Sequence, residues 1–133
     1  MQSATQPGRV SNAKLWAGRI ISALPVLLFL FSAFLTLMNK PQVTEGMAHY
    51  GYPTRAVLPI GIAELVCTLL YIIPQTSVLG AILLTAYLGG ATATHVRVGE
   101  PFYMPVLVGV LVWLGLYLRE KRLQALVPLR KSN

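Results

Sequence analysis

The sequence predicts an all-α protein, a bundle of four transmembrane helices with both termini in the cytoplasm. Three observations support this fold class. Charged residues make up 11% of the chain and hydrophobic residues 55%, whereas charged residues are roughly 25% of soluble globular proteins. Long stretches contain no charged residue, and most of the positive charge falls on one predicted side of a membrane. A soluble domain of 133 residues exposes too much surface to hide these apolar side chains, which excludes a cytosolic enzyme, a disordered tail and a secreted scaffold.

Three uncharged stretches, residues 20–39, 65–96 and 101–118, define the predicted spans. A helix that crosses a bilayer needs about 20 mostly apolar residues, so the middle stretch is too long for one span. It breaks at Pro74, which ends a helix, and the polar residues that follow suit a turn. We therefore predict one integral membrane domain over residues 1–133, with a basic cytoplasmic tail at 119–133. Its transmembrane helices are placed near 16–38, 56–73, 77–96 and 103–118.

The flanks of these spans support the assignment. The first apolar run ends in Met38-Asn39-Lys40, which lacks the small residues of a signal-peptide cleavage site, so the first helix is expected to stay uncleaved. Thr54 is a suitable N-cap for the second helix, and residues 40–55 are expected to form a loop. In the tail, Leu123, Leu126 and Val127 recur at helical intervals among basic residues. That spacing predicts either a short helix on the cytoplasmic surface or a solvated basic tail.

The positive charges predict the orientation. With four helices, the N-terminal tail, the turn near residue 75 and the C-terminal tail share one side. That side has eight of the eleven Lys and Arg residues, and the opposite side has only Lys40, Arg55 and Arg97. The net charge of +7 is thus explained by topology and by attraction to anionic lipid headgroups, so nucleic acid is excluded as a partner. Trp16, Tyr71 and Tyr117 are expected at the cytoplasmic interface.

Glu64 is the first candidate functional residue, because it is an acid near the middle of a predicted span. A charge in hydrocarbon costs several kcal/mol, so such a residue faces the bundle interior and finds partners. Its neighbours at helical spacing, Cys67, Thr68 and Tyr71, would form a semi-polar stripe with it. Glu64 is either a structural group hydrogen-bonded between helices or a group that accepts protons or orients a ligand.

The third predicted helix carries two patterns near its outer end. Ala86 with Gly90, and Gly89 with Ala93, are pairs of small residues four apart, which predict close packing of helices in lipid. Polar side chains rise along the same segment toward the outer surface. With Glu64 they predict a polar pocket in the outer half of the bundle, lined by Glu64, Tyr87, Thr94, His95 and Arg97. We name Glu64, His95 and Arg97 as the candidate catalytic residues, and His95 could relay protons near neutral pH.

Other chemistries lack the residues they need. The two histidines have no metal-ligand spacing, so no metal site is predicted. Cys67 is the lone cysteine, which excludes an intrachain disulfide and a paired-cysteine redox motif and leaves it as a small buried hydrophobe. Motifs for nucleotide binding, serine hydrolysis and haem attachment are also missing.

The chain resembles the DoxX-like family over nearly its whole length, from Trp16 to Arg130. The resemblance rests on the blocks 51–52 (GY), 59–64 (PIGIAE), 70–76 (LYIIPQT), 80–91 (GAILLTAYLGGA), 94–97 (THVR) and 113–119 (WLGLYLR). It implies a small four-helix protein of the bacterial cytoplasmic (inner) membrane and points to the positions of Glu64, His95 and Arg97. Relatives in the wider DoxX/DoxD group are similar to the membrane subunit of a thiosulfate:quinone oxidoreductase, and others are linked to oxidative-stress complexes.

The sequence therefore leaves three alternative functions. The first is a quinone- or redox-associated membrane subunit, with quinone as the cofactor. The second is a non-enzymatic membrane module that anchors or stabilises a partner protein, with the basic tail as the contact. The third is a small transporter or an intramembrane enzyme for a lipophilic substrate, in which Glu64 acts as general acid or base. The predicted partners are the lipid bilayer, a membrane or cytoplasmic protein, and further copies of the chain.

Overall fold

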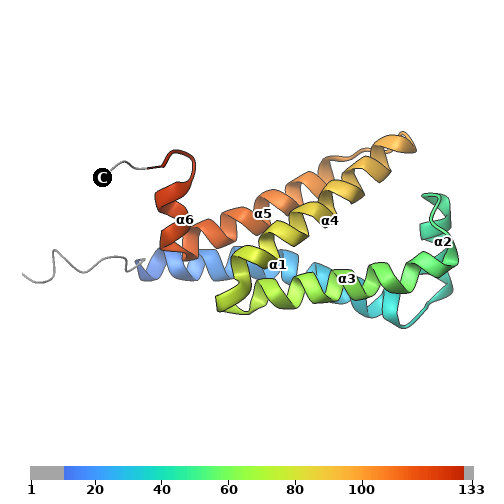
Figure 1. The fold of residues 1–133 in the computed structure, drawn as a ribbon, viewed down its shortest axis with the longest axis horizontal. Helices are drawn as coiled ribbons and strands as arrows, with labels where there is room; N and C mark the ends of the chain where they lie inside the picture. The colour runs from blue at the N-terminus through green and yellow to red at the C-terminus, as the bar shows by residue number, and fades with distance from the viewer. Residues whose placement is uncertain (1–10, 131–133) are drawn as a thin grey trace, which may run out of the picture.

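The computed structural model describes residues 11–130, and every regular element in that range is a helix (Figure 1). The elements in chain order are α1 (Asn12–Leu37), α2 (Pro41–His49), α3 (Thr54–Ile72), the 3₁₀ turn η2 (Pro74–Thr76), α4 (Ser77–Arg97), α5 (Tyr103–Arg119) and α6 (Lys121–Leu126). Arg9 and Lys131, which count toward the predicted charge asymmetry, lie outside the described residues.

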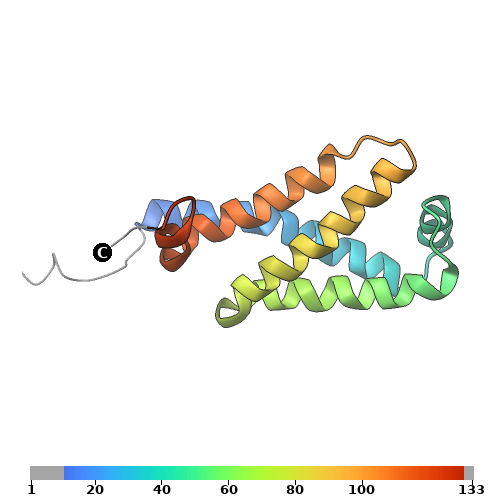
Figure 2. The same ribbon diagram turned by 45° about the horizontal axis from the view of Figure 1, so that its top comes forward.

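The four long helices run alternately up and down and close a ring. Each packs against two others, in the order α1, α3, α4, α5 and back to α1. The start of α1, the η2 turn and α6 lie at one end, which we call the terminal end (Figure 1). Helix α2 and the connection between α4 and α5 lie at the other, which we call the loop end. Figure 2 shows α4 crossing the bundle obliquely on its way to that end.

Three helical segments have the length and composition to cross a membrane, as predicted. They are Asn12–Leu37, Thr54–Ile72 and Pro74–Arg97, each of which contains an 18-residue window whose mean hydropathy is 2.5, 1.7 and 1.4 respectively. Helix α5 is apolar but shorter, and its 17 residues rise about 26 Å at 1.5 Å per residue, against a hydrocarbon core of about 30 Å.

The distribution of side chains also suits lipid surroundings. Large apolar residues face outward, among them Leu27 at 64% exposed and Phe31 at 62%. The interior instead contains polar side chains (Ser22, Thr36, Glu64, Thr68, Ser77 and Thr94), all buried and all hydrogen-bonded. Water would make this arrangement costly, whereas hydrocarbon favours apolar groups outside and polar groups paired within the bundle.

The closest helix packing involves other glycines than those predicted. A Cβ atom on Gly80 would lie 2.2 Å from the backbone nitrogen of Tyr71, and one on Gly115 would lie 2.3 Å from the Ser22 hydroxyl. Gly80 therefore brings α4 against α3, and Gly115 brings α5 against α1. Gly89 and Gly90, by contrast, have nothing within 4 Å of that position in the described chain. The predicted small-residue contact at Gly89 and Gly90 is not made inside this bundle.

The connection predicted as a loop at residues 40–55 contains helix α2, so that prediction was wrong. Pro41 is the first residue of the helix, where its missing N–H needs no partner. No residue of α2 is buried, and its 9 residues are too few for the spacing of apolar side chains to predict a helix from sequence. The chain leaves α2 through Gly51, whose φ of +88° favours glycine.

Other local predictions differ in detail. Helix α3 begins at Thr54 itself, with Pro53 as its N-cap, so the Thr54 side chain does not cap the helix. Tyr71, expected at the membrane interface, is fully buried, because its hydroxyl finds partners inside the bundle at Ser22 and Val112. The short helix predicted in the tail is present as α6, where the Glu120 side chain accepts a hydrogen bond from the Arg122 backbone at 3.2 Å.

Candidate functional site

A cavity of about 360 Å³ opens at the loop end, between α2, α3 and α4. We call it the loop-end cavity. Its lining consists of four aromatic or imidazole rings and several small or aliphatic residues: Met47, Tyr50, Tyr52, Ile60, Ala86, Tyr87, Gly90, Ala91, Thr94 and His95. Gly90 has no side chain, and those of Ala86 and Ala91 are small, so space remains beside this part of α4. These three small residues of α4 thus border a hollow, unlike Gly80, which packs against α3.

Thr94 ties the wall of the cavity together. Its hydroxyl donates to the Gly90 carbonyl at 2.8 Å and lies 2.8 Å from the Tyr52 hydroxyl. Since a threonine hydroxyl has one proton, Tyr52 must be the donor in the second contact. This bond attaches the segment after α2 to α4 and presents the Tyr52 ring to the cavity.

His95 has one ring nitrogen engaged and one available. Nδ1 lies 2.7 Å from the carbonyl oxygen of Ala91, and since a carbonyl oxygen only accepts, Nδ1 carries a proton. In the neutral ring Nε2 is then the acceptor atom. The ring also packs against Tyr50, with centroids 5.2 Å apart and a tilt of 43°. His95 is therefore fixed in orientation, and it lines the cavity while only half-buried.

Glu64 lies deeper, on α3, where it is 2% exposed. Its carboxylate accepts a hydrogen bond from the Ser32 hydroxyl of α1 at 3.2 Å. The Tyr87 phenol, which lines the cavity, lies near the same carboxylate. Thr68, one turn away, donates to the Glu64 backbone carbonyl at 2.7 Å, so its hydroxyl does not compete for the carboxylate. Tyr87 is thus the link between the buried acid and the cavity.

Arg97 stands at the rim and not in the cavity wall. Its guanidinium donates to the backbone carbonyl of Tyr50, and it lies beside Gly51, where a Cβ would meet it at 3.3 Å. Arg97 therefore holds the end of α2 over the end of α4. This role positions Tyr50 above the cavity.

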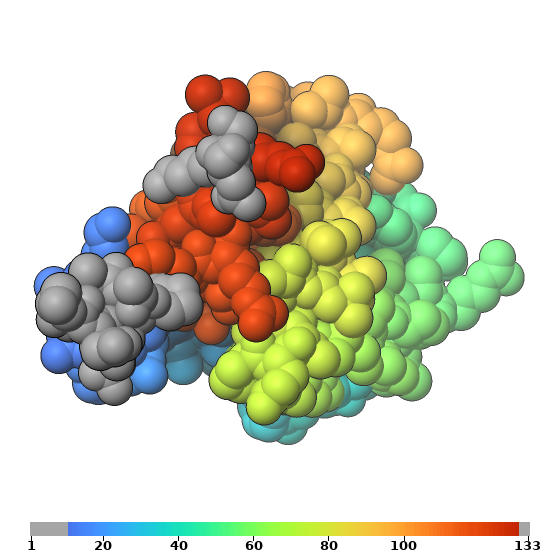
Figure 3. All heavy atoms as spheres, turned by 60° about the vertical axis from the view of Figure 1, so that its left-hand side comes forward, coloured from blue at the N-terminus to red at the C-terminus, as the bar shows by residue number. Residues whose placement is uncertain are grey.

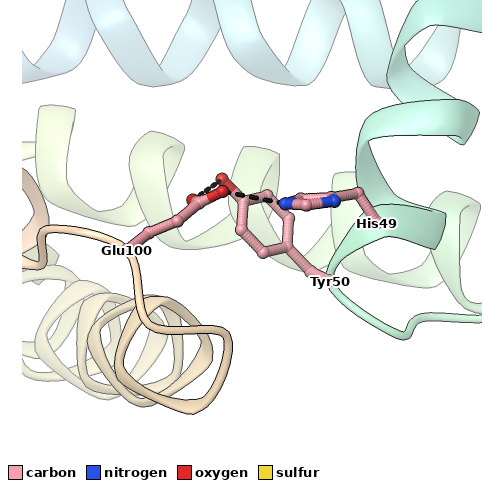
Figure 4. Close-up of polar contacts among 3 residues, drawn as sticks. All are labelled: His49, Tyr50 and Glu100. Atoms are coloured by element: carbon pink, nitrogen blue, oxygen red, sulfur yellow. Dashed lines mark hydrogen bonds and ion pairs between the residues drawn. The ribbon is translucent and has the colours of Figure 1, made fainter.

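A second clasp, the loop-end latch, consists of His49, Tyr50 and Glu100 (Figure 4). Both Glu100 carboxylate oxygens are engaged, one 2.8 Å from His49 Nε2 and the other accepting from the Tyr50 hydroxyl at 2.8 Å. These hydrogen bonds, from Tyr50 first and His49 second, lower the pKa of Glu100 below its ordinary value. The same carboxylate raises the pKa of the Tyr50 phenol.

The latch predicts a dependence of α2 on acidity. Because the folded pKa of Glu100 is depressed, the latch is fully formed above the ordinary carboxyl pKa and is lost as the pH falls through the lowered value. We expect hydrogen exchange of the α2 amides, corrected for intrinsic rates, to speed up over that acid range. Glu100→Gln should show fast exchange at neutral pH and little further change in acid. A pH response that persists in this variant would assign it to another group.

The structure thus separates the five predicted site residues into three positions. Tyr87, Thr94 and His95 line one cavity, Glu64 lies beneath it, and Arg97 lies above it. Sequence reasoning missed Ser32, Tyr50 and Tyr52, which come from other segments. The signal for the two tyrosines was the run Tyr50-Gly51-Tyr52 in a connection between spans.

Two further observations bear on the chemistry of the site. Within residues 11–130, no three His, Cys, Asp or Glu side chains gather as metal ligands do. A larger hollow, of about 560 Å³ between α4 and α5, is almost wholly apolar in its lining. We favour the smaller loop-end cavity because binding sites combine apolar walls with a few convergent polar groups.

Comparison with known proteins places the chain by sequence. The model of the DoxX-like family matches residues 20–115, a range that includes Glu64, all of α4 and the loop-end cavity. The searches of curated proteins and of solved structures returned no match.

Proposed function

The chain belongs to the DoxX-like family of membrane proteins, and we propose that it is a quinone- or redox-associated membrane subunit whose loop-end cavity holds the ring of a lipid-soluble quinone. One observation carries the proposal: an aromatic-walled cavity that His95 lines and in which Tyr87 lies next to a buried acid. Catalytic use of Glu64 and His95 is part of this proposal.

The residues fit such a ring. The cavity volume of about 360 Å³ lies in the range of small-molecule sites, about 300–1,000 Å³. The rings of Tyr50, Tyr52 and Tyr87 offer flat apolar surface, and the Tyr87 hydroxyl and a protonated His95 offer donors for carbonyl oxygens. The apolar outer surface of α3 and α4 leaves an isoprenoid tail in contact with lipid.

The protein's own contribution would be binding and proton handling. A bound quinone supplies two-electron, two-proton redox chemistry. Glu64 would hold a proton away from water, with Ser32 donating to one oxygen of its carboxyl group, and the adjacent Tyr87 hydroxyl would connect it to the cavity. His95 exchanges protons at Nε2 on the half-exposed side. Electrons would come from a partner protein, which makes this chain a subunit.

We propose the following membrane placement. Helix α5 is a fourth span, which α1 and α4 flank, and the terminal end faces the cytoplasm of a bacterial inner membrane. The charge bias supports this orientation, since six of the nine basic residues that the structure describes belong to the terminal end: Lys14, Arg19, Arg119, Lys121, Arg122 and Arg130. The loop-end cavity then lies in the outer leaflet.

Direct binding tests the proposal. We expect the protein, purified in mild detergent, to bind a short-chain quinone and to retain quinone in its lipid extract. His95→Ala and Thr94→Val should each raise Kd up to about tenfold through lost polar contacts. Thr92→Val is the matched control. Thr92 makes the same kind of hydrogen bond to its own helix, at 2.8 Å to the Leu88 carbonyl, but it lines the hollow between α4 and α5 and not the loop-end cavity. A protein that neither copurifies with nor binds quinone contradicts the proposal.

Anchoring of a partner is the second candidate function, favoured by the apolar residues of the tail. Leu126, Val127 and Leu129 are 58%, 45% and 79% exposed beside basic residues. This function predicts that deletion of residues 123–133 abolishes activity in cells while Glu64→Gln and His95→Ala leave it intact. The opposite pattern supports chemistry in the bundle.

A further inference from the structure

Arg119, at the terminal end of α5, is held in place by a buried network. Its Nε donates to the Ser22 hydroxyl of α1 at 3.1 Å. Tyr71 of α3, which is fully buried, has its hydroxyl 3.0 Å from the same Ser22 oxygen and 2.7 Å from the Val112 carbonyl. The guanidinium carbon lies 5.0 Å from the centre of the Tyr71 ring. Two contacts thus hold Arg119 directly, one to Ser22 and one to the Tyr71 ring. The other two hold Tyr71 in place, so the network joins α1, α3 and α5.

The protons of this network point in one direction. The Val112 carbonyl can only accept, so it takes the Tyr71 proton, and the Ser22 hydroxyl then donates to Tyr71. Ser22 in turn accepts from Arg119 Nε. All hydroxyl protons are therefore used inside the bundle, and within residues 11–130 the Nε–H is the only donor of Arg119 that makes a hydrogen bond, which leaves its two terminal amino groups for a ligand.

Within the part of the chain that the structure describes, no acid pairs with Arg119. In residues 11–130 the one ion pair within 4 Å joins His49 to Glu100, at the opposite end. Glu120, the nearest acid in sequence, accepts from the Arg122 backbone. Arg19 of α1 packs over the Trp16 ring at 5.2 Å and also lacks a carboxylate partner in this range.

The two arginines border the same hollow. A cavity of about 210 Å³ is lined by Arg19, Ser22, Ala23, Val26, Tyr71, Ile72 and Arg119. A neighbouring one of about 300 Å³ shares Arg19, Ile72 and Arg119 and adds Leu15, Pro74, Ser77 and Glu120. Figure 3 views this end, where α1, the turn between α3 and α4, and the α5–α6 segment meet. We call the two cavities together the Arg19–Arg119 cleft.

The cleft changes character with depth. Arg19 and Arg119, together with Glu120, line the part nearer the terminal end, whereas Ala23 and Val26 continue the cleft along α1 into the apolar part of the bundle. Trp16 beside it is 60% exposed, and exposed tryptophan is typical of the headgroup layer of a membrane. A ligand suited to this cleft has an anionic head and an apolar chain.

We propose that the Arg19–Arg119 cleft binds the phosphodiester headgroup of an anionic phospholipid, with an acyl chain along Ala23 and Val26. Arginine recognises phosphate through paired N–H donors, and the fixed position of Arg119 lowers the entropy lost on binding. This site is separate from the loop-end cavity and does not depend on a quinone binding there. The bound phosphate group belongs to a lipid of the bilayer rather than to dissolved phosphate, because an inorganic ion would leave the apolar part of the cleft unfilled.

Native mass spectrometry of the full chain in mild detergent tests the proposal, with phosphatidylglycerol and phosphatidylcholine as probes. We expect phosphatidylglycerol to bind about tenfold more tightly, and Arg19→Gln to remove that preference. Lys121→Gln, an exposed position at the same end with the same loss of charge, should retain it. Arg119→Gln should behave like Arg19→Gln, but its contact with buried Ser22 is also structural, so Arg19→Gln is the decisive variant.

Three outcomes would overturn the proposal. Equal binding of the two lipids would remove the role of the anionic headgroup. If Lys121→Gln and Arg19→Gln lost the preference for phosphatidylglycerol equally, the preference would come from general charge attraction at this end and not from the cleft. Displacement of phosphatidylglycerol by millimolar inorganic phosphate would assign the cleft to a free anion instead of a lipid.

Discussion

Replacing Gly80 with alanine is expected to lower the free energy of unfolding by about 3 kcal/mol, a large overpacking effect for one methyl group. The new Cβ would lie 2.2 Å from the Tyr71 nitrogen and 2.5 Å from its Cα. Both atoms belong to the backbone of α3, so no side chain can rotate away and the two helices must separate. Tyr71 would move with α3 and disturb the contacts that hold Arg119. Thermal or denaturant unfolding in detergent measures the loss.

Gly89→Ala on the same helix is the matched control and should change stability in the opposite direction. Nothing lies within 4 Å of its Cβ position in the described chain, so only the helix propensity remains, which favours alanine by up to about 1 kcal/mol. Similar destabilisation by both variants would mean that Gly89 packs against something in the detergent-solubilised protein, such as a second copy. Neutral behaviour of Gly80→Ala would contradict the close contact between α3 and α4.

Replacing Glu64 with glutamine is expected to reduce quinone-linked activity in membranes about 100-fold, the lower range for loss of a group that transfers protons. This prediction rests on the proposed function. Glutamine keeps the shape of the side chain and an oxygen that accepts from Ser32, so the unfolding free energy should change by less than about 1 kcal/mol. The variant therefore separates proton transfer from structural support. Activity in membranes and unfolding of the purified protein are measured together.

Ser32→Ala provides the control for this variant. It removes the hydrogen bond to the carboxylate but leaves the acid and Tyr87 in place, so activity should fall by only a fewfold. Full activity of Glu64→Gln combined with a clear loss of stability would show a structural glutamate. It would then favour the anchoring function over chemistry in the bundle.

The helices that could be predicted from sequence are those with a strong apolar signal. The segments at Thr54–Ile72 and Ser77–Arg97 agree with the predicted spans to within two residues, because uncharged stretches and Pro74 mark their limits. Helix α2 was missed because its 9 residues are too few for a periodic apolar pattern. Glu64 was recognisable as an interior acid because charge in hydrocarbon is costly, and the structure buries it to 2% exposure.

The composition of the candidate site could be predicted only in part. Thr94 and His95 share α4 with Tyr87, so helical spacing brings them to one side. Tyr52 and Ser32 reach the site from other helices or connections, 42 and 32 residues away from their partners. No local pattern encodes such pairs, because they depend on how far each helix slides along its neighbour.

Family membership, the all-helical class and the membrane-spanning segments follow from the order of apolar and charged residues along the chain, since the bilayer selects for those features one segment at a time. The assignment of each glycine and polar group to a contact, a cavity or a cleft depended on tertiary structure. Gly80 and Gly89 lie nine positions apart on one helix, yet one touches a backbone and the other faces open space. The difference arises from the neighbouring helix, whose position is set by packing over the whole ring.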